Sequence, residues 1–316
     1  MHDKFDYYEH PIFNPYEFLI NTPPMRRLKN VLDGWLWTGV TGGIIRGEAR
    51  CGKTTAATQL ANRLKTRGGK IIPTHYFSVP ARDRRTIHAL YRALTVSANL
   101  PLKTNSQIEP MFSNLVHFFL EHCIENETKQ FVLLVDEAQR LSLNQYNVFA
   151  EFHDFIREKL KILFTVIFIV NSDEAEIVFS NVSESRYRHI YGRFFKKITD
   201  FYGVQSESDV KNCLKQYDTL RFPRGTGPTY TEFFLPEIVR KGWRYSSLSS
   251  VIWSVFHEFQ KDYHLTSWGM ESFVCTVNVL LYDFFPKFGP DQCNQDMVRA
   301  AIDVSGLTPS MVKSCS

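Results

Sequence analysis

One short stretch carries the residue types that proteins use to hold phosphate groups. It fits the pattern Gly-x-x-x-x-Gly-Lys-Ser/Thr, and its members are Gly47, Glu48, Ala49, Arg50, Cys51, Gly52, Lys53 and Thr54. The two glycines let the backbone curl so that successive N–H groups face a phosphate, and a following helix adds positive potential at its start. We expect Lys53 to reach the β- and γ-phosphates of ATP and the Thr54 hydroxyl to ligate Mg²⁺. Thr55 extends this candidate site by one residue.

A chance glycine-rich turn is the alternative interpretation of this stretch. A phosphate-binding loop needs a strand before it and a helix after it. The sequence predicts a short strand at 43–46 and a helix over about 53–65, in the required order. This context favours the phosphate-binding loop.

A pair of acidic residues follows a second apolar run. Residues 131–135 read Phe-Val-Leu-Leu-Val and lead directly into Asp136 and Glu137. An acid at the end of a buried strand can hold Mg²⁺, and we expect Asp136 to do so. Glu137 could polarise the attacking water as a general base. Alone, the pair could equally cap a helix, but together with the phosphate-binding loop it predicts ATP hydrolysis.

Two later segments add polar and basic groups. The strand predicted at 162–170 ends at Asn171, which would lie beside the γ-phosphate if this strand sits between the other two. Arg193, in a segment that also holds Arg186 and Arg188, could reach the γ-phosphate of a neighbouring subunit as an arginine finger. The alternatives are a helix cap after the strand and a solvated basic face.

The elements that must position these residues alternate between strand and helix. Apolar runs predict strands at 43–46, 70–79, 131–135 and 162–170. Helical spacing predicts helices at 25–37, 53–65, 86–99, 107–127 and 145–160. Apolar strands alternating with helices indicate a parallel sheet that is covered on both faces.

The strand pattern stops near residue 222, where several prolines and glycines follow. Helices are predicted beyond it at 232–241, 248–263, 270–285 and 291–304. We therefore expect an aromatic, proline-rich arm at 1–24, an α/β core at 25–222, a helical lid at 223–285, and a C-terminal helix and tail at 286–316.

Composition excludes several classes of protein. Hydrophobic residues make up 44% of the 316 residues and charged residues 22%, so disorder, collagen and coiled coil fit poorly. No apolar run approaches the roughly 20 residues of a membrane span, and the start does not resemble a secretory signal. We expect a soluble, cytoplasmic protein with no membrane partner. The six cysteines form no Cys-x-x-Cys pair, which argues against a disulfide framework or a zinc site.

Binding to nucleic acid has to come from local basic clusters, because the formal net charge is only +4. The cluster of Arg82, Arg84 and Arg85 opens a predicted helix after the second strand. It lacks interleaved aromatic residues, so it does not predict a platform for single strands. We expect contacts with the phosphates of duplex DNA, made without reading sequence. A solvated helix start is the alternative.

The order of the motifs resembles that of AAA+ ATPases. It runs from the phosphate-binding loop through the Asp-Glu pair and Asn171 to Gly-Arg-Phe at 192–194 and a helical region. The resemblance covers about residues 20–285. It implies a P-loop NTPase fold with a small helical lid, ATP and Mg²⁺ as cofactors, Asn171 as the first sensor and Arg193 as the finger. It also implies Arg244 as the second sensor, although its spacing from Gly242 departs from the commoner Gly-x-x-Arg.

Within that superfamily, the length, the aromatic start and Asp-Glu-Ala-Gln at 136–139 resemble the TniB/TnsC branch, the ATP-dependent regulators of DNA transposition. This resemblance implies a homo-oligomeric ring or filament on duplex DNA that links a target-selecting TniQ-like protein to transposase subunits. A replication initiator or loader ATPase, and a nucleotide-gated scaffold with little hydrolysis, are the alternatives. A helicase is disfavoured, because the residues beyond Pro223 offer no second α/β domain.

Overall fold

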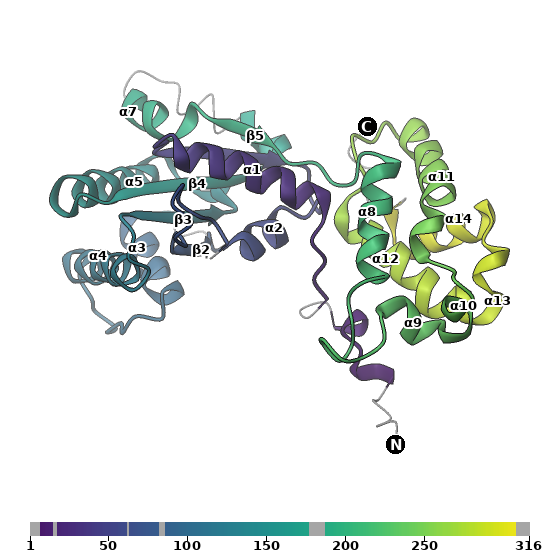
Figure 1. Ribbon diagram of the computed structural model, residues 1–316. Helices are drawn as coiled ribbons and strands as arrows, with labels where there is room; N and C mark the ends of the chain where they lie inside the picture. The colour runs from purple at the N-terminus through teal and green to yellow at the C-terminus, as the bar shows by residue number, and fades with distance from the viewer. Residues whose placement is uncertain (1–6, 15–17, 62, 82–85, 177–186, 308–316) are drawn as a thin grey trace. The chain divides into compact units, whose positions relative to one another are not determined.

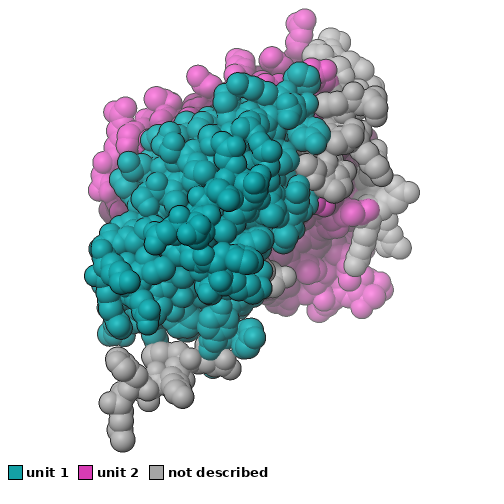
Figure 2. All heavy atoms as spheres, turned by 90° about the vertical axis from the view of Figure 1, so that its right-hand side faces the viewer, with its two compact units in different colours: residues 1–26, 202–316 teal, residues 27–201 magenta. Residues whose placement is uncertain are grey.

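The computed structural model describes residues 7–14, 18–61, 63–81, 86–176 and 187–307 (Figure 1). The chain divides into two compact units, coloured separately in Figure 2. Residues 27–201 form one, which we call the sheet unit. Residues 1–26 and 202–316 form the other, which we call the helical unit. No helix in the described ranges is long and apolar enough to span a membrane.

The sheet unit is built on a five-stranded parallel sheet with helices around it, the AAA+ P-loop fold that the motif order predicts. In chain order the strands are β1 (Gly42–Gly47), β2 (Thr74–Ser78), β3 (Gln130–Asp136), β4 (Leu163–Asn171) and β5 (Ile198–Asp200). In space the order is β2-β3-β4-β1-β5. The central strands β3 and β4 are buried along almost their whole length, as their apolar sequences require in a sheet covered on both faces.

The strand order places β4 between β1 and β3, which confirms the arrangement on which the expectation for Asn171 depended. Gly47, the last residue of β1, pairs with Asn171, the last residue of β4. Because all five strands are parallel, their carboxyl ends meet at one edge of the sheet, where ligands bind in folds of this type. The phosphate-binding loop, Asp136 and Asn171 therefore share that edge.

The helices of the sheet unit follow the predicted segments closely. They are α2 (Lys53–Leu60), α3 (Ile87–Ser97), α4 (Ile108–Glu125), α5 (Leu143–Phe155), which continues as η4 (Ile156–Leu160), the short η3 (Ala138–Arg140), α7 (Arg188–Ile190) and η6 (Tyr191–Phe195). Helix α1 (Pro23–Trp37) spans the division between the units. Helix α2 ends five residues earlier than predicted, because Ala61 leaves helical geometry and the Leu64 carbonyl accepts a bond from Ile72.

The helical unit contains every described element beyond residue 202. These are α8 (Glu207–Tyr217), α9 (Tyr230–Phe234), α10 (Pro236–Arg240), η7 (Tyr245–Leu248), α11 (Ser249–Asp262), α12 (Met270–Val279), η8 (Leu280–Phe284), α13 (Phe285–Phe288), η9 (Pro290–Gln292) and α14 (Gln295–Val304). The single helix predicted at 232–241 is two helices, since Pro236 has no N–H to continue the first. Helix α8 and strand β5 were not predicted.

The N-terminal arm is part of the helical unit. Its short helices η1 (Tyr7–Glu9) and η2 (Pro11–Phe13) flank His10, whose side chain is fully buried. Aromatic rings surround that imidazole at centroid distances of 4.4 to 5.1 Å, from Phe222, Tyr230, Phe233 and Phe234. The boundaries of the compact units differ from the predicted division. Helix α8 and the arm belong to the same unit as the helices predicted for the lid, and α14, predicted as part of the C-terminal tail, packs in the same core.

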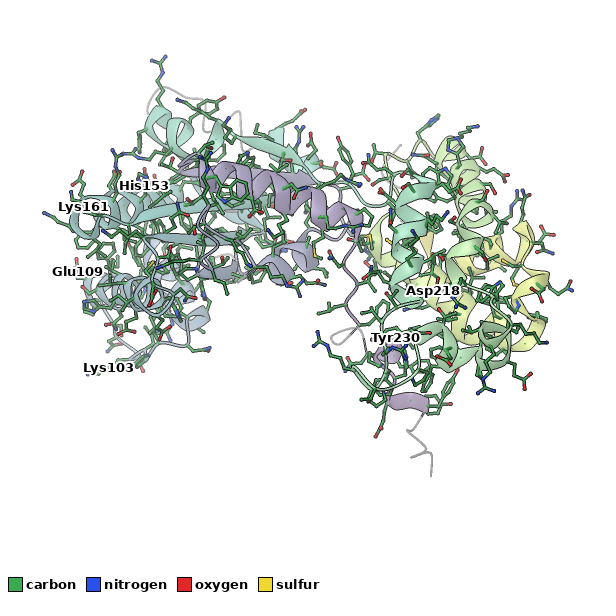
Figure 3. All side chains as sticks on the ribbon, viewed as in Figure 1. Lys103, Glu109, His153, Lys161, Asp218 and Tyr230 are labelled. Atoms are coloured by element: carbon green, nitrogen blue, oxygen red, sulfur yellow. The ribbon has the colours of Figure 1, made fainter. Side chains whose placement is uncertain are left out.

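Asp218 fixes the turn that carries Arg244 (Asp218 is labelled in Figure 3). Its carboxylate accepts bonds from the backbone N–H groups of Tyr245 and Ser246 at 2.9 and 3.0 Å, at the start of η7. The Thr231 hydroxyl donates to the same carboxylate at 2.9 Å. A negative charge at the start of a helix satisfies its unpaired N–H groups, so Asp218 fixes the start of η7, directly after Arg244, and connects it with Thr231 of α9.

Candidate nucleotide site

The loop between β1 and α2 requires glycine at both motif positions. Gly52 precedes α2 with φ 101°, in the left-handed region where only glycine is relaxed. A Cβ on Gly47 would lie 2.5 Å from the Phe201 carbonyl oxygen, so a side chain there would displace the strand edge. The loop therefore has the strand–loop–helix context that a phosphate-binding loop needs.

Lys53 is buried at the first turn of α2, and its ammonium group lies among oxygen atoms. Nζ donates to the carbonyl oxygens of Gly47 and Glu48 at 2.7 and 2.6 Å and to Asn171 Oδ1 at 3.1 Å. A buried charge of this kind has to be paired with acceptors. The structure thus brings Lys53 together with Asn171, as the strand order requires. Phosphate oxygens could take the place of the loop carbonyls.

Asp136 is the centre of a second hydrogen-bonded group. Its Oδ2 accepts from the Thr54 hydroxyl at 2.6 Å and from the Tyr76 hydroxyl at 2.7 Å. Its Oδ1 accepts from the backbone N–H of Glu137 at 2.8 Å. Burial, reinforced by Asp136, raises the pKa of Tyr76 well above its usual value, so this phenol donates at neutral pH.

Tyr76 is a residue that the sequence analysis missed. It lies on β2, which pairs with β3 so that Ser78 is opposite Asp136. Residues two apart in a strand share a face, so Tyr76 and Ser78 lie on the same face of the sheet. The sequence of β2 does carry side chains with polar atoms at alternate positions, which indicates one polar face. Only the pairing of β2 with β3, seen in the structure, places Tyr76 beside Asp136.

The oxygen atoms of Thr54 and Asp136 suit a magnesium ion. Mg²⁺ prefers hard oxygen ligands and usually takes one or two from the protein, the rest from water and substrate phosphates. Within the described ranges, no group of three or more His, Cys, Asp and Glu residues could hold a metal. The hydroxyl and carboxylate that already meet at 2.6 Å therefore fit an ion completed by nucleotide phosphates.

Glu137 follows β3 with φ 56°, in the left-handed region. It precedes η3 but makes no side-chain bond to cap that helix, so the capping interpretation does not apply to it. Its Oε2 instead lies 3.0 Å from Arg140 Nη2 and accepts from Gln139 Nε2 at 2.9 Å. The carboxylate is part-exposed at the carboxyl edge of the sheet, beside Asp136.

The comparisons with known proteins agree with this geometry. Residues 40–178 match the protein family described as AAA domain. This part of the chain is similar to an AAA domain. The match begins just before β1 and extends past Asn171, so it includes the whole candidate nucleotide site. A search of the curated proteins found no significant match.

Solved structures share the AAA+ fold at low sequence identity. The Aeropyrum pernix ORC2 protein, solved as ADPNP-ADP complexes, is 13% identical with a TM-score of 0.51, covering 96% of this chain and 74% of that one. Drosophila ORC bound to DNA is 12% identical with a TM-score of 0.52, covering 93% and 68%. Against Cdc6p from Pyrobaculum aerophilum, 18% identical with a TM-score of 0.43, the match covers 65% of this chain and about half (52%) of that one. The two structures with TM-scores above 0.5, ORC2 and Drosophila ORC, support the fold assignment and no more.

Arg193 lies at the opposite edge of the five-stranded sheet from the candidate site. Its backbone carbonyl accepts a bond from the Thr41 hydroxyl at 2.8 Å, and Thr41 immediately precedes β1. Its Nη2 contacts both carboxylate oxygens of Asp154 at 2.9 and 2.8 Å. The structure therefore does not bring Arg193 to the phosphate-binding loop of its own chain. Arg188 begins α7, and Arg186 lies outside the described residues.

The other predicted residues lie in the helical unit, outside the described residues or in the phosphate-binding loop itself. Arg244 belongs to the helical unit, where Nη1 donates to the carbonyl oxygens of Trp243 and Val239 at 2.8 and 3.3 Å. The DNA candidates Arg82, Arg84 and Arg85 lie outside the described residues. Cys51 does lie in the loop, and burial raises the pKa of its thiol although Lys53 opposes the shift.

Proposed function

We propose that the chain is an ATP-hydrolysing regulator of DNA transposition, which assembles on duplex DNA and connects target selection with recruitment of the transposase. The observation that carries the ATPase part is the meeting of Lys53, Asn171, Thr54 and Asp136 at one edge of the sheet, with Glu137 adjacent. The transposition part rests on the resemblance of the motifs and the N-terminal segment to the TniB/TnsC branch.

Each residue of the site has a distinct task in this proposal. Lys53 exchanges the carbonyl oxygens of Gly47 and Glu48 for those of the β- and γ-phosphates. Bound Mg²⁺ would neutralise phosphate charge from its place on Thr54 and Asp136. Glu137 orients the attacking water and accepts its proton. Asn171, held by Lys53, contacts the γ-phosphate side of the site as first sensor, and we assign Arg244 as second sensor.

Arg193 can act only on a neighbouring subunit in this scheme. Five residues of β1 lie between Thr41, to which Arg193 is bonded, and Gly47, the first residue of the phosphate-binding loop. At a rise of roughly 3.3 Å per residue they hold the two edges about 16 Å apart. A finger on one edge and a nucleotide on the other favour a head-to-tail arrangement, which closes into a ring or continues as a filament.

Several subunits are needed for DNA binding in this proposal. With a formal net charge of +4, one subunit makes few phosphate contacts, and salt weakens them. Subunits joined along one duplex multiply the contacts through effective concentration. We assign the contacts to Arg82, Arg84 and Arg85, without base readout. The Drosophila ORC structure, which shares the fold, is bound to DNA.

We assign the contacts with a TniQ-like protein and with the transposase to the N-terminal arm and to the chain beyond residue 285. In the arm, the His10 side chain is fully buried, whereas the Tyr8 side chain is 76% exposed. A cytoplasmic location fits these partners. A replication initiator or loader is the second candidate, because the fold shared with ORC2 covers 96% of this chain and fits that role as well.

The proposal is tested with Glu137→Gln, which should keep ATP binding but lose turnover by at least about 100-fold, because the amide cannot accept a proton. The variant should accumulate on random duplex DNA in the presence of ATP, as seen by electron microscopy, and should recruit the cognate transposase. Lys53→Ala is the control that should lose ATP binding itself.

Three results would overturn the proposal. Hydrolysis by Glu137→Gln at the rate of the parent would show that Glu137 is not the base. Sequence-specific DNA binding by single subunits without ATP would favour a conventional DNA-binding regulator, and binding confined to one origin-like sequence would favour the replication initiator.

A further inference from the structure

One arginine outside the nucleotide motifs holds the carboxylate of Glu137. Arg140 Nη2 lies 3.0 Å from Glu137 Oε2. The other terminal nitrogen of the same guanidinium, Nη1, donates to the carbonyl oxygen of Val79 at 3.0 Å. A single planar group therefore joins the expected general base to the backbone that directly follows β2.

The Val79 end of this connection is firmly placed. The strands β2 and β3 are paired, with Ser78 opposite Asp136. The backbone N–H of Val79 continues the ladder by donating to the Asp136 carbonyl at 3.0 Å, and the Val79 side chain is buried. Arg140 is consequently anchored on the strand pair that carries Asp136.

The Glu137 end has little to hold it apart from this anchor. Its backbone has left the strand, with φ 56°, and its side chain makes no capping bond. Gln139 Nε2 donates to the same Oε2 at 2.9 Å, but Gln139 Oε1 is buried without a partner among the described residues. Gln139 thus has no second anchor for its amide, whereas Arg140 has one.

We propose that Arg140 is a positioning residue for Glu137. This inference rests on the proposed function, in which Glu137 acts on the attacking water. Arg140 and Gln139 both occupy Oε2, so Oε1 is the oxygen that accepts the proton, and the guanidinium fixes its direction relative to Asp136. A rigid fork with two bonds does this better than a lysine, which offers a point charge on a flexible stem.

The test compares variants of the full chain in ATP hydrolysis. Arg140→Ala should lower kcat by about 10- to 100-fold, the cost of a misplaced catalytic group, while KM and nucleotide affinity stay at the parent values. Arg140→Lys should remain close to the alanine variant, because lysine replaces the planar fork, whose two terminal nitrogens each hold one acceptor, with a single nitrogen on a flexible stem. Arg92→Ala is the matched control, since among the described residues the Arg92 guanidinium donates to the Thr104 carbonyl, at 3.5 Å, and not to a residue of the site.

A double variant separates positioning from a structural role. In the Glu137→Gln background, Arg140→Ala should cause no further loss in single-turnover hydrolysis, because its effect passes through Glu137. Parent-like turnover of Arg140→Ala overturns the inference, and so does an equal loss in both backgrounds or a loss of nucleotide affinity. A parent chain that hydrolyses no ATP overturns the proposed function together with the inference, and the parent assay alone reveals that case.

Discussion

Two hydroxyl groups donate to one oxygen of Asp136, and they differ in what happens when a metal binds. The Thr54 hydroxyl and the Tyr76 hydroxyl both contact Oδ2, at 2.6 and 2.7 Å. A magnesium ion would draw the Thr54 oxygen into its own coordination sphere. Tyr76 would then be the remaining side-chain donor to Oδ2 and would hold the carboxylate toward the metal.

Removing the Tyr76 hydroxyl should therefore weaken metal binding. We expect Tyr76→Phe to raise the Mg²⁺ concentration needed for half-maximal ATPase by about 10-fold or more, as is usual for residues that orient metal ligands. The measurement is a Mg²⁺ titration of turnover at fixed ATP. Tyr191→Phe is the control, because Tyr191 is part-exposed and stacks on Phe195. An unchanged Mg²⁺ requirement in Tyr76→Phe would contradict this role.

At the scale of elements, the arm is attached to the helical unit by a buried imidazole. Burial lowers the pKa of His10 from its usual 6.5 to about 4. The imidazole is held neutral because Nδ1 accepts from the Ile12 N–H and because aromatic rings surround it. Protonation would place an unsolvated charge among those rings, so it favours release of the arm.

The pH dependence of stability follows from that shift. In the unfolded chain His10 binds a proton below about pH 6.5, whereas in the folded chain it does so only near pH 4. The contribution of His10 to the free energy of unfolding is therefore complete above pH 6.5 and is lost as the pH falls toward 4. At full protonation of His10, the free energy of unfolding is lower by about 3 kcal/mol. Urea unfolding between pH 4 and 7 should show a smaller pH slope for His10→Asn than for the parent. Asn at position 10 still accepts from Ile12, and the exposed His257→Asn is the control that should keep the parent slope.

The sequence predicted those elements whose pattern is local. The predicted strands at 131–135 and 162–170 are continuous apolar runs, and the structure confirms them as β3 and β4. The glycine-rich loop, whose motif has a fixed spacing, lies between β1 and α2 as predicted. Helix α8 was missed although its buried Val210, Cys213, Leu214 and Tyr217 have helical spacing, and β5 was missed because it has only three residues. The contacts of Tyr76 with Asp136 and of Arg140 with Val79 depend on the pairing of β2 with β3. A local sequence pattern does not indicate which strands pair.

At the scale of the whole molecule, the position of Arg193 fits the proposed assembly, in which a nucleotide site is completed by an arginine of the neighbouring subunit. One chain supplies Lys53 and Glu137 at the carboxyl edge of its sheet, and its finger candidate lies at the amino edge, bonded to Asp154. In the proposed assembly, Arg193 would exchange Asp154 for a neighbour's γ-phosphate. The Arg193–Asp154 pair is part-exposed, so breaking it costs little, about 1 kcal/mol or less.

Mixed assemblies test this arrangement directly. Arg193→Ala should bind ATP like the parent yet lose turnover by about 10³-fold, as is typical for a missing arginine finger. Lys53→Ala subunits cannot bind ATP but still carry an intact Arg193. When the two variants are mixed, an Arg193→Ala subunit with bound ATP can receive the finger of a Lys53→Ala neighbour, so turnover should rise with the fraction of mixed interfaces.

Asp154→Ala, which leaves Arg193 in place but unpaired from that carboxylate, should not abolish turnover. Parent-like hydrolysis by Arg193→Ala, or no gain at any mixing ratio, would rule out a finger that acts between subunits.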